Sequence, residues 1–178
     1  WNQIKDVSRT AYEDIYQRLG ANLEEVGESF YQPMIPQVVE ELKRAGLLQE
    51  SDGRQIVRVP GHKLPLTVVK WDGGYTYDTT DLTALRYRLV DLNVDAVYYF
   101  VGMEQAQHFQ LLFYVAEKMG WTTGKELRHL QFGMILGEDG GKMKSREGQV
   151  VVLADLLDQA LIQTKGVCQT KSKFKTFS

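Results

Sequence analysis

A helix is predicted at the start of the chain, where apolar residues recur three or four positions apart and Gly20 follows as a stop signal. The apolar positions are Ile4, Val7, Ala11, Ile15 and Leu19. A second helix is predicted over residues 35–45, with Pro36 in its first turn and Gly46 after its last residue. The pattern therefore places two helices before any strand.

Two antiparallel pairs of short strands are predicted after the second helix. Ser51-Asp52-Gly53 and Asp72-Gly73-Gly74 are turn signals, and each lies between two short apolar segments. The strands are predicted at 47–49 with 55–59 and at 66–70 with 75–77. Each pair is expected to form a β-hairpin.

The second half of the chain alternates between helix and strand patterns. A helix is predicted after three candidate caps, and its leucines share one face. The caps are Thr79, Thr80 and Asp81, and the leucines are Leu82, Leu85 and Leu89. Residues 94–101 are almost entirely apolar, as in a parallel strand that is buried on both faces. The later elements are predicted as a helix over 104–119, strands over 130–134 and 150–153, and a last helix from 153.

This order of elements predicts an α/β fold. Strands that alternate with helices form an open, mostly parallel sheet with right-handed crossovers and flanking helices, here with a β-hairpin insertion. In such sheets ligands bind outside the carboxyl ends of the strands. That rule selects residues 77–81, residues 102–108 and the loop after Leu136 as candidate site segments.

Composition narrows the class of protein. At 178 residues the chain has room for one ordinary domain, and its net charge of -2 argues against a general coat for nucleic acid. The single cysteine, Cys168, rules out a disulfide framework and a cysteine-rich metal site. The histidines lack metal-ligand spacing, so no metal site is predicted. No apolar run approaches the roughly 18 residues of a membrane span, so no membrane partner is expected.

The two ends of the chain favour a piece of a longer protein. The chain begins at Trp1 within a helical pattern, and no acidic residue follows Asp158, whereas four lysines do. These are Lys165, Lys171, Lys173 and Lys175. Residues 1–163 are expected to form one partial domain, and residues 164–178 a disordered basic tail.

One loop carries a cluster of cations. Residues 137–148 read Gly-Glu-Asp-Gly-Gly-Lys-Met-Lys-Ser-Arg-Glu-Gly, which places Lys142, Lys144, Ser145 and Arg146 among glycines that let the backbone approach a ligand. Clustered cations suit a polyphosphate whose charge grows during a reaction. Taken alone, a solvated hairpin tip explains the loop slightly better, because Asp-Gly and Gly-Gly are ordinary turn signals.

Four polar residues outside this loop could bind a ligand. Taken alone, Asp81 is better explained as a helix cap and Glu28 as a solvated loop residue. Gln105 and His108 lie on one face of the first turn of a predicted helix, where free backbone amides can also bind anions. By itself, His108 is better explained as a capping or partly exposed histidine.

Several of these segments, in this order, resemble the class I arginyl-tRNA synthetases. Residues 72–82, Asp-Gly-Gly-Tyr-Thr-Tyr-Asp-Thr-Thr-Asp-Leu, resemble the arginine-pocket segment of that family. Lys142-Met143-Lys144-Ser145-Arg146 is similar to its signature loop, commonly Lys-Met-Ser-Lys-Ser. The other matching segments are Gly27-Glu28-Ser29, Gln105-Ala106-Gln107-His108-Phe109-Gln110 and Phe132-Gly133-Met134-Ile135-Leu136-Gly137. The order and spacing hold over about residues 1–159.

The resemblance implies a site for arginine. A guanidinium is a permanently charged, planar fork of five donors, so its pocket needs carboxylates. The family pattern implies that Glu28 and Asp81 bind the guanidinium, that Tyr77 shapes the pocket, and that Gln105 holds the polar groups of the amino acid. A lysine substrate could not satisfy both acceptors in that geometry.

The resemblance also implies a site for ATP. Lys142 and Lys144, with Ser145 and Arg146, would be the catalytic residues that steady the leaving pyrophosphate. Mg²⁺ would accompany the ATP. The residues implied on the adenosine side are His108, Phe132, Gly133, Met134 and Ile135.

The implied reaction has two steps and needs no protein nucleophile. The carboxylate of arginine attacks the α-phosphate of ATP, which gives arginyl-adenylate and pyrophosphate, and a ribose hydroxyl at the 3′ end of tRNA then takes the arginyl group. Positioning and charge stabilisation would carry the catalysis. The implied partners are arginine, ATP and tRNA, and the full-length protein is expected to be a cytoplasmic monomer, with an organellar form left open.

Two departures from the family pattern limit these implications. Ser145 stands where the usual loop has its second lysine, and no His-x-Gly-His sequence is present. The chain is therefore expected to be the second half of a Rossmann-like nucleotide-binding domain, the catalytic domain of the enzyme, with an apolar edge or face exposed. Alone, it is expected to bind ligands weakly and not to aminoacylate tRNA.

A class I synthetase for another amino acid is a close variant of this enzyme, and two functions of other classes are the alternatives to it. A non-catalytic module derived from a synthetase, which binds RNA or protein, is the alternative that the missing segments and the basic tail favour. A kinase-type nucleotide-binding domain is disfavoured, because no Gly-x-x-x-x-Gly-Lys-Ser/Thr sequence follows a strand.

Overall fold

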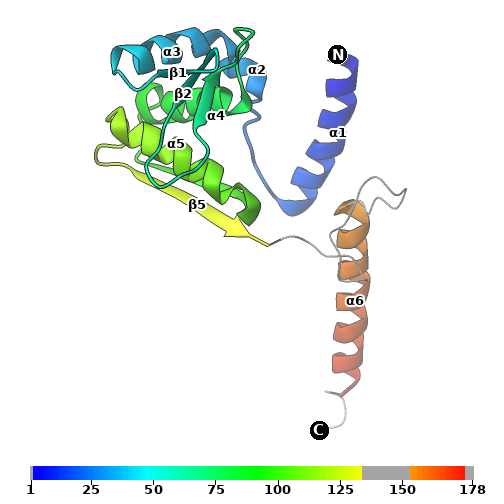
Figure 1. Cartoon of the computed structure of the whole chain (residues 1–178). Coiled ribbons are helices and arrows are strands. Elements are labelled where there is room, and N and C mark those ends of the chain that lie inside the picture. Colours follow the sequence, from blue (N-terminus) through cyan, green and yellow to red (C-terminus); the bar gives the residue numbers. More distant parts are fainter. Residues whose placement is uncertain (1, 134–152, 175–178) are drawn as a thin grey trace. The chain divides into compact units, whose positions relative to one another are not determined.

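The computed structural model describes residues 2–133 and 153–174, which divide between two units (Figure 1). Unit 2 spans Val26–Met134 and contains both sheets, and unit 1 combines Trp1–Glu25 with Ile135–Ser178. In chain order the elements are α1 (Asn2–Leu19), α2 (Glu28–Tyr31), η1 (Gln32–Met34), α3 (Ile35–Arg44), β1 (Gln49–Ser51), β2 (Arg54–Val57), β3 (Leu66–Val69), α4 (Tyr77–Arg86), η2 (Tyr87–Asp91), β4 (Ala96–Gly102), η3 (Met103–Gln105), α5 (Ala106–Lys118), β5 (Glu126–Phe132) and α6 (Leu153–Phe174).

The parallel part of the predicted fold is confirmed by β4 and β5. The two strands pair in parallel from Ala96 opposite Glu126 to Gly102 opposite Phe132, and α5 is the helix that connects them. The strand predicted at 130–134 begins earlier, at Glu126. Three of the four residues from Glu126 to His129 are polar, so the apolar pattern did not reveal the first half of the strand.

A separate antiparallel sheet has the order β1-β2-β3. The first predicted hairpin is confirmed. Of the second, only the antiparallel bridge of Val69 with Tyr75 forms, and β3 pairs instead with β2. Tyr77, expected in a strand, is instead the first residue of α4. Unit 2 therefore contains one three-stranded antiparallel sheet beside the parallel pair.

The N-cap of α4 is Thr76, so the prediction of Thr79, Thr80 or Asp81 as the cap is wrong. The hydroxyl oxygen of Thr76 accepts a hydrogen bond from the Thr79 amide at 3.4 Å, and the Thr79 hydroxyl accepts one from the Thr76 amide, which completes a capping box. The two hydroxyls also donate to backbone carbonyls of β3, at Thr67 and Val68, at 2.6 and 2.5 Å. The start of α4 is thus fixed to the edge of the antiparallel sheet.

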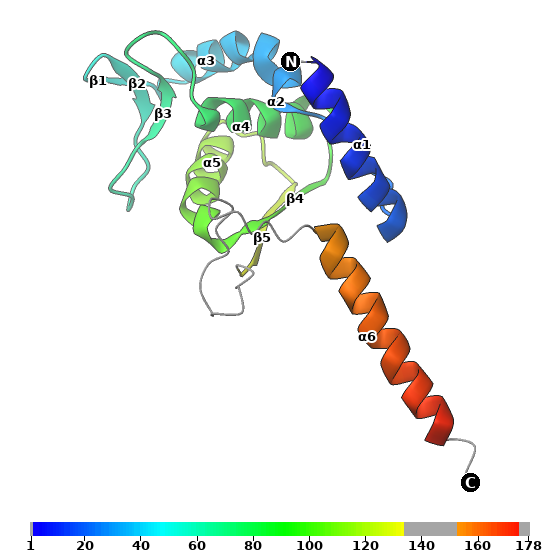
Figure 2. The same cartoon turned by 90° about the vertical axis from the view of Figure 1, so that its right-hand side faces the viewer.

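The core of unit 2 is arranged around α4. This helix contacts α2, α3, α5 and β3, and Figure 2 shows it above α5, with the antiparallel strands to one side. The predicted leucine face is confirmed, because Leu82, Leu85 and Leu89 are all buried. They join buried residues of neighbouring elements, among them Val38, Leu42, Leu66, Val68, Leu112 and Val115.

The strand expected to be buried on both faces is buried on one. Val97 lies in the core, whereas Tyr98 and Phe100 alternate onto an exposed face of β4, and Phe132 is exposed at the end of β5. The described residues therefore leave an apolar face of the parallel pair uncovered. An exposed apolar edge or face of this kind is what the sequence analysis predicts.

Unit 1 consists of two long helices over its described residues. α1 confirms the first predicted helix, and Arg18 Nη2 lies 2.6 Å from Asp158 Oδ1 of α6. α6 continues to Phe174, so residues 164–174 are helical rather than disordered as expected. Residues 150–152 of the predicted strand 150–153 lie outside the described residues, and Leu153 begins α6. No helix among the described residues is long and apolar enough to span a membrane.

Truncation of Leu112 should destabilise the protein. Leu112 has 0% of its surface exposed in the core of unit 2, so the change Leu112→Ala should lower the free energy of unfolding by about 2–5 kcal/mol through a cavity. Urea unfolding followed by circular dichroism measures this change.

Leu64→Ala is the matched control, because the Leu64 side chain is 68% exposed in the β2–β3 connection. Its cost should stay below about 0.5 kcal/mol. Equal losses from the two substitutions would contradict the assignment of the core.

Candidate functional site

Three titratable side chains meet where α4 and α5 pack together. His108 Nε2 lies 2.7 Å from Asp81 Oδ2, and His108 Nδ1 lies 3.0 Å from Asp78 Oδ1. The first contact is a hydrogen bond, whereas the second has the distance of an ion pair without the alignment of a hydrogen bond. We refer to Asp78, Asp81 and His108 as the carboxylate–histidine cluster.

Local structure brings this cluster together. Because Thr76 caps α4, Asp78 falls in the first turn and Asp81 three residues later, on the same side of the helix. His108 is the third residue of α5, which begins just beyond the carboxyl end of β4. The cluster therefore lies at the carboxyl end of a parallel strand, where α/β folds bind ligands.

The sequence analysis expected Asp81 at the start of the helix as a cap. The structure places it beyond the first turn, and it does not cap the helix. Since Thr76 is the N-cap, Asp81 is the fifth residue of α4 and its side chain is free to interact with another element. Helix capping therefore does not explain why a carboxylate stands at this position.

The protonation of His108 follows from its two neighbours. Burial opposes a charge on the ring, but the contacts with Asp78 and Asp81 and their negative charges outweigh burial and raise the pKa of His108 from 6.5 to about 9. At neutral pH the ring is therefore an imidazolium, and the cluster carries one net negative charge. A site of this charge suits a ligand with one cationic group.

Exposure differs in a graded way across the cluster. The side chains of His108 and Asp78 are 9% and 14% exposed, whereas that of Asp81 is 44% exposed. Asp81 is therefore the member of the cluster that a ligand can reach from solvent.

Aromatic rings border the cluster on both helices. The ring of Tyr77 lies 5.2 Å from that of His108, and Phe109 lies 5.3 Å from it on the other helix. The charge of Asp78, together with burial and the charge of Asp81, raises the pKa of the Tyr77 hydroxyl, so it stays protonated at neutral pH. Tyr77 remains exposed and could present both a ring and a hydroxyl to a ligand.

Not every predicted binding residue joins this cluster. Glu28 is the first residue of α2 and Gln105 is the N-cap of α5, and both are exposed. Among the described residues, no hydrogen bond or ion pair connects either of them to Asp81 or His108. The structure therefore assembles Tyr77, Asp81 and His108 and leaves the other two apart from them.

The predicted phosphate and adenosine residues are only partly described. Phe132 is exposed at the end of β5, and Gly133 follows it in an irregular segment. The remaining predicted residues lie outside the described residues, namely Met134, Ile135, Lys142, Lys144, Ser145 and Arg146.

Asp78 is a site residue that the sequence analysis missed. Its spacing of three from Asp81 on a helix was a usable signal, but the pattern at 75–77 predicted a strand and hid the helical geometry.

Arg88 was also missed, and its guanidinium donates to the hydroxyl of Tyr99 at 2.9 Å and of Tyr31 at 3.4 Å. Arg88 joins η2 to α2 and β4 and is explained by packing.

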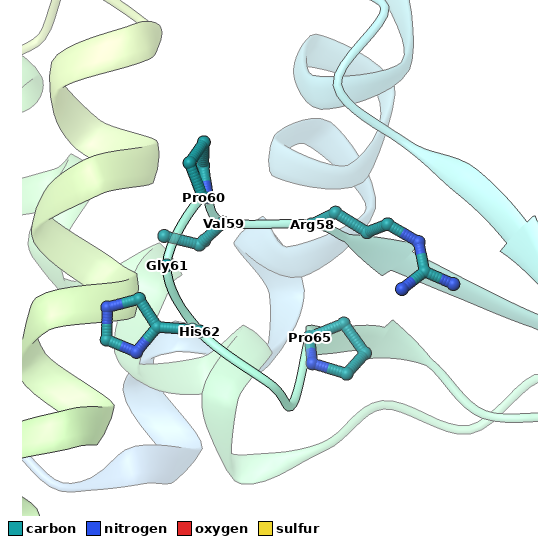
Figure 3. Close-up of a pocket in the computed structure, with 6 residues that line it drawn as sticks. All are labelled: Arg58, Val59, Pro60, Gly61, His62 and Pro65. Atoms are coloured by element: carbon teal, nitrogen blue, oxygen red, sulfur yellow. The ribbon is translucent and has the colours of Figure 1, made fainter.

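A cavity of about 300 Å³ lies elsewhere, in the connection between β2 and β3. It is lined by Arg58, Val59, Pro60, Gly61, His62 and Pro65. Figure 3 shows Arg58 and His62 pointing to opposite sides of the connecting loop, so their polar groups do not converge. None of the predicted site residues lines this cavity, and we assign it no function.

No metal centre is formed by the residues that the structure describes. Among residues 2–133 and 153–174, no group of three or more His, Cys, Asp and Glu side chains is arranged to hold an ion. The cluster is instead a hydrogen-bonded and ion-paired arrangement.

Comparison with known proteins places the whole chain in one group. Residues 1–178 match the family described as tRNA synthetases class I (R), catalytic domain. The chain is 43% identical over 183 residues to the chloroplastic/mitochondrial arginine–tRNA ligase of Arabidopsis thaliana, which covers 100% of this chain and 28% of that protein. It is 44% identical over 180 residues to the cytoplasmic arginine–tRNA ligase of Homo sapiens, with 100% and 27% covered. The chain thus spans under a third of the length of these relatives.

A solved structure agrees with this result. The crystal structure of arginyl-tRNA synthetase from Plasmodium falciparum superposes with a TM-score of 0.82 at 30% identity, covering 100% of this chain and 30% of that one. The fold predicted from the sequence, a part of a mixed α/β catalytic domain, is confirmed.

Stability should fall as the pH rises through the titration of His108. A pKa raised from 6.5 to about 9 gives a stabilisation that is complete below pH 6.5 and is lost as the pH rises through about 9. We expect the free energy of unfolding to decrease over this interval by on the order of 2 kcal/mol. Urea unfolding at several pH values measures it.

The variant His108→Gln should lack this decrease, whereas His62→Gln should keep it, because His62 lies in the β2–β3 connection away from both carboxylates. A decrease of the same size in His108→Gln would assign it to another group.

Proposed function

The chain belongs to the catalytic-domain family of the class I arginyl-tRNA synthetases, and we propose that the natural protein containing it is an arginine–tRNA ligase. The observation that carries this proposal is the match of the family model over residues 1–178, supported by relatives named arginine–tRNA ligase at 43% and 44% identity. The proposed protein joins arginine to its tRNA at the expense of ATP. No finding favours the non-catalytic module.

The proposed reaction proceeds in two steps. Arginine is activated when its carboxylate attacks the α-phosphate of ATP, and pyrophosphate leaves as arginyl-adenylate forms. A ribose hydroxyl at the 3′ end of tRNA then attacks the acyl carbon and releases AMP. The protein contributes binding, orientation and charge stabilisation, with no covalent intermediate on a side chain.

Asp81 is the proposed main acceptor for the guanidinium of arginine. Its exposure of 44% makes it reachable, and the cluster that contains it carries one net negative charge to match one cation. Tyr77, whose ring lies beside His108, is proposed to form a wall of the same pocket. A carboxylate accepts a guanidinium more selectively than an ammonium, because the planar fork can donate two parallel hydrogen bonds.

Glu28 and Gln105 are proposed as further arginine contacts. Both are exposed, and each is at the start of a helix, α2 or α5, where its side chain can turn toward a ligand. The ligand would bridge the distance between these residues and Asp81. Glu28 would supply a second carboxylate and Gln105 an amide for the polar groups of the amino acid.

ATP is proposed to bind along the carboxyl ends of the parallel strands. His108 would border the adenosine from the start of α5, and since its nitrogens are engaged by carboxylates, it would do so through its ring. Phe132 and Gly133 at the end of β5 would extend this surface, followed by Met134 and Ile135. The pyrophosphate contacts are proposed for Lys142, Lys144, Ser145 and Arg146.

Mg²⁺ is proposed only as a companion of the ATP phosphates. The described residues form no group that could hold an ion by themselves, so no step is assigned to a protein-bound metal.

A cytoplasmic location and a monomeric state are proposed as well; cytoplasmic and organellar enzymes both occur among the relatives.

Removal of the Asp81 carboxylate should impair the use of arginine. In the natural protein containing this chain, Asp81→Ala should lower kcat/KM for arginine by roughly 100-fold or more, because the guanidinium loses its main charged acceptor, while KM for ATP stays within about twofold. Arginine-dependent ATP–pyrophosphate exchange, with tRNA present, measures both constants.

Asp95→Ala is the matched control, since it removes an exposed carboxylate in the loop before β4. It should leave both constants unchanged. If arginine use survives Asp81→Ala and Glu28→Ala, the proposed pocket is wrong.

Loss of a loop cation should slow the first chemical step. Lys144→Ala should lower kcat of the exchange by about 100-fold with little change in KM for arginine, because the charge is needed as pyrophosphate leaves. Lys118→Ala, at the end of α5, is the control and should have no effect. A rise in KM for arginine alone would assign Lys144 to substrate binding.

A further inference from the structure

We propose that Asp78 and His108 are positioning residues that fix the carboxylate of Asp81 for its ligand. This inference rests on the proposed function, because the ligand in question is the guanidinium of arginine. It assigns a role to Asp78, which neither the motifs nor the comparisons single out, and gives His108 a second role besides bordering the adenosine.

The contacts form a chain that runs from the interior to the surface. Asp78 and His108 are nearly buried, Asp81 is the exposed end, and His108 contacts both carboxylates through opposite ring nitrogens. A buried pair at 3.0 Å holds the ring, and the ring in turn donates to Oδ2 of Asp81 at 2.7 Å. Asp78 and His108 therefore act on the guanidinium only through Asp81.

This arrangement determines which oxygen of Asp81 is available. Nε2 of His108 donates a hydrogen bond to Oδ2, whereas Oδ1 accepts none from the described residues. A free aspartate side chain can turn about two bonds, whereas a guanidinium contact of fixed direction needs the carboxylate held in one orientation. The hydrogen bond from His108 to Oδ2 fixes the orientation of the Asp81 carboxylate, so Oδ1 presents its lone pairs to the ligand in one direction.

Asp78 is needed because its charge keeps both nitrogens of the ring protonated. A neutral imidazole has one donor and one acceptor, and either neutral form would place a lone pair against a carboxylate oxygen. With Asp78 on one side and Asp81 on the other, only the imidazolium presents a proton toward each carboxylate, as an ion pair with Asp78 and a hydrogen bond to Asp81. The cluster then holds two negative charges and one positive charge, which leaves the single negative charge that a guanidinium neutralises.

The groups that face His108 in the described residues come mainly from α4. They are the carboxylates of Asp78 and Asp81 and the hydroxyl-bearing ring of Tyr77, while its own helix contributes the apolar ring of Phe109. Loss of the Asp78 charge should therefore lower the pKa of His108 toward its ordinary value, with Asp81 as the remaining carboxylate.

The test uses Asp78→Asn in the natural protein containing this chain. Arginine-dependent ATP–pyrophosphate exchange is measured from pH 6.5 to pH 9. We expect KM for arginine to rise about 10-fold at pH 8 and to fall again toward pH 6.5, where His108 is protonated, with KM for ATP unchanged. Asp78→Glu, which restores the charge, should recover at least part of the loss.

Asp155→Asn is the matched control, because it makes the same chemical change in the first turn of another helix, α6. It should leave KM for arginine and its pH profile unchanged. A loss in Asp78→Asn that is equal for arginine and ATP and independent of pH would reflect misfolding alone and would overturn the positioning role.

A second measurement needs no substitution at Asp78. Histidines labelled with ¹³C report the pKa of His108 by NMR, with its signal assigned by its absence in His108→Gln. Arginine that binds Asp81 should lower this pKa, because a new cation faces the same carboxylate. An unchanged pKa at saturating arginine would overturn the proposal.

The outcomes separate this inference from the function on which it rests. If exchange depends on arginine and on Asp81 but Asp78→Asn has a normal KM for arginine, the positioning role is wrong and the enzyme assignment stands. If no amino acid supports exchange by the unsubstituted protein, the proposed function fails, and this inference fails with it.

Discussion

The contact of one imidazolium with two carboxylates organises the site of this protein. His108 joins α5 to α4 through Asp78 and Asp81, at 3.0 and 2.7 Å, with most of its surface withdrawn from solvent. Removing a charge from water is costly unless it is paired, so a half-satisfied cluster would be unstable. The exposed carboxylate of Asp81 therefore owes its position to two residues that are more buried than Asp81 itself.

The cluster depends in turn on the position at which α4 begins. Thr76 and Thr79 close a capping box and donate their hydroxyls to the backbone of β3, which fixes both the first residue of the helix and its attachment to the antiparallel sheet. A start one residue later would rotate Asp78 and Asp81 by about 100° around the helix axis, away from His108. Two threonines without direct contact to the proposed ligand thus set the geometry of its acceptor.

Much of this architecture could be predicted from the sequence, because its signals were local. The apolar run at 94–101 and the helix that follows it correctly predicted a parallel strand and a crossover, and the leucine spacing of α4 gave its buried face. The start of α4 could not be predicted, because Tyr75, Thr76 and Tyr77 suit a strand equally well and the hydroxyl partners lie in β3. Asp78 was missed for a related reason, since its partner lies 30 residues away in sequence on another helix.

The carboxylate–histidine cluster is the proposed receptor for the guanidinium of arginine. A crystal structure of the natural protein with bound arginine tests it most directly. We expect the guanidinium within hydrogen-bond distance of Oδ1 of Asp81, with His108 still bound to Oδ2 and Asp78 behind it. A guanidinium bound away from Asp81, or a His108 ring turned out of the cluster to admit the ligand, would contradict the account.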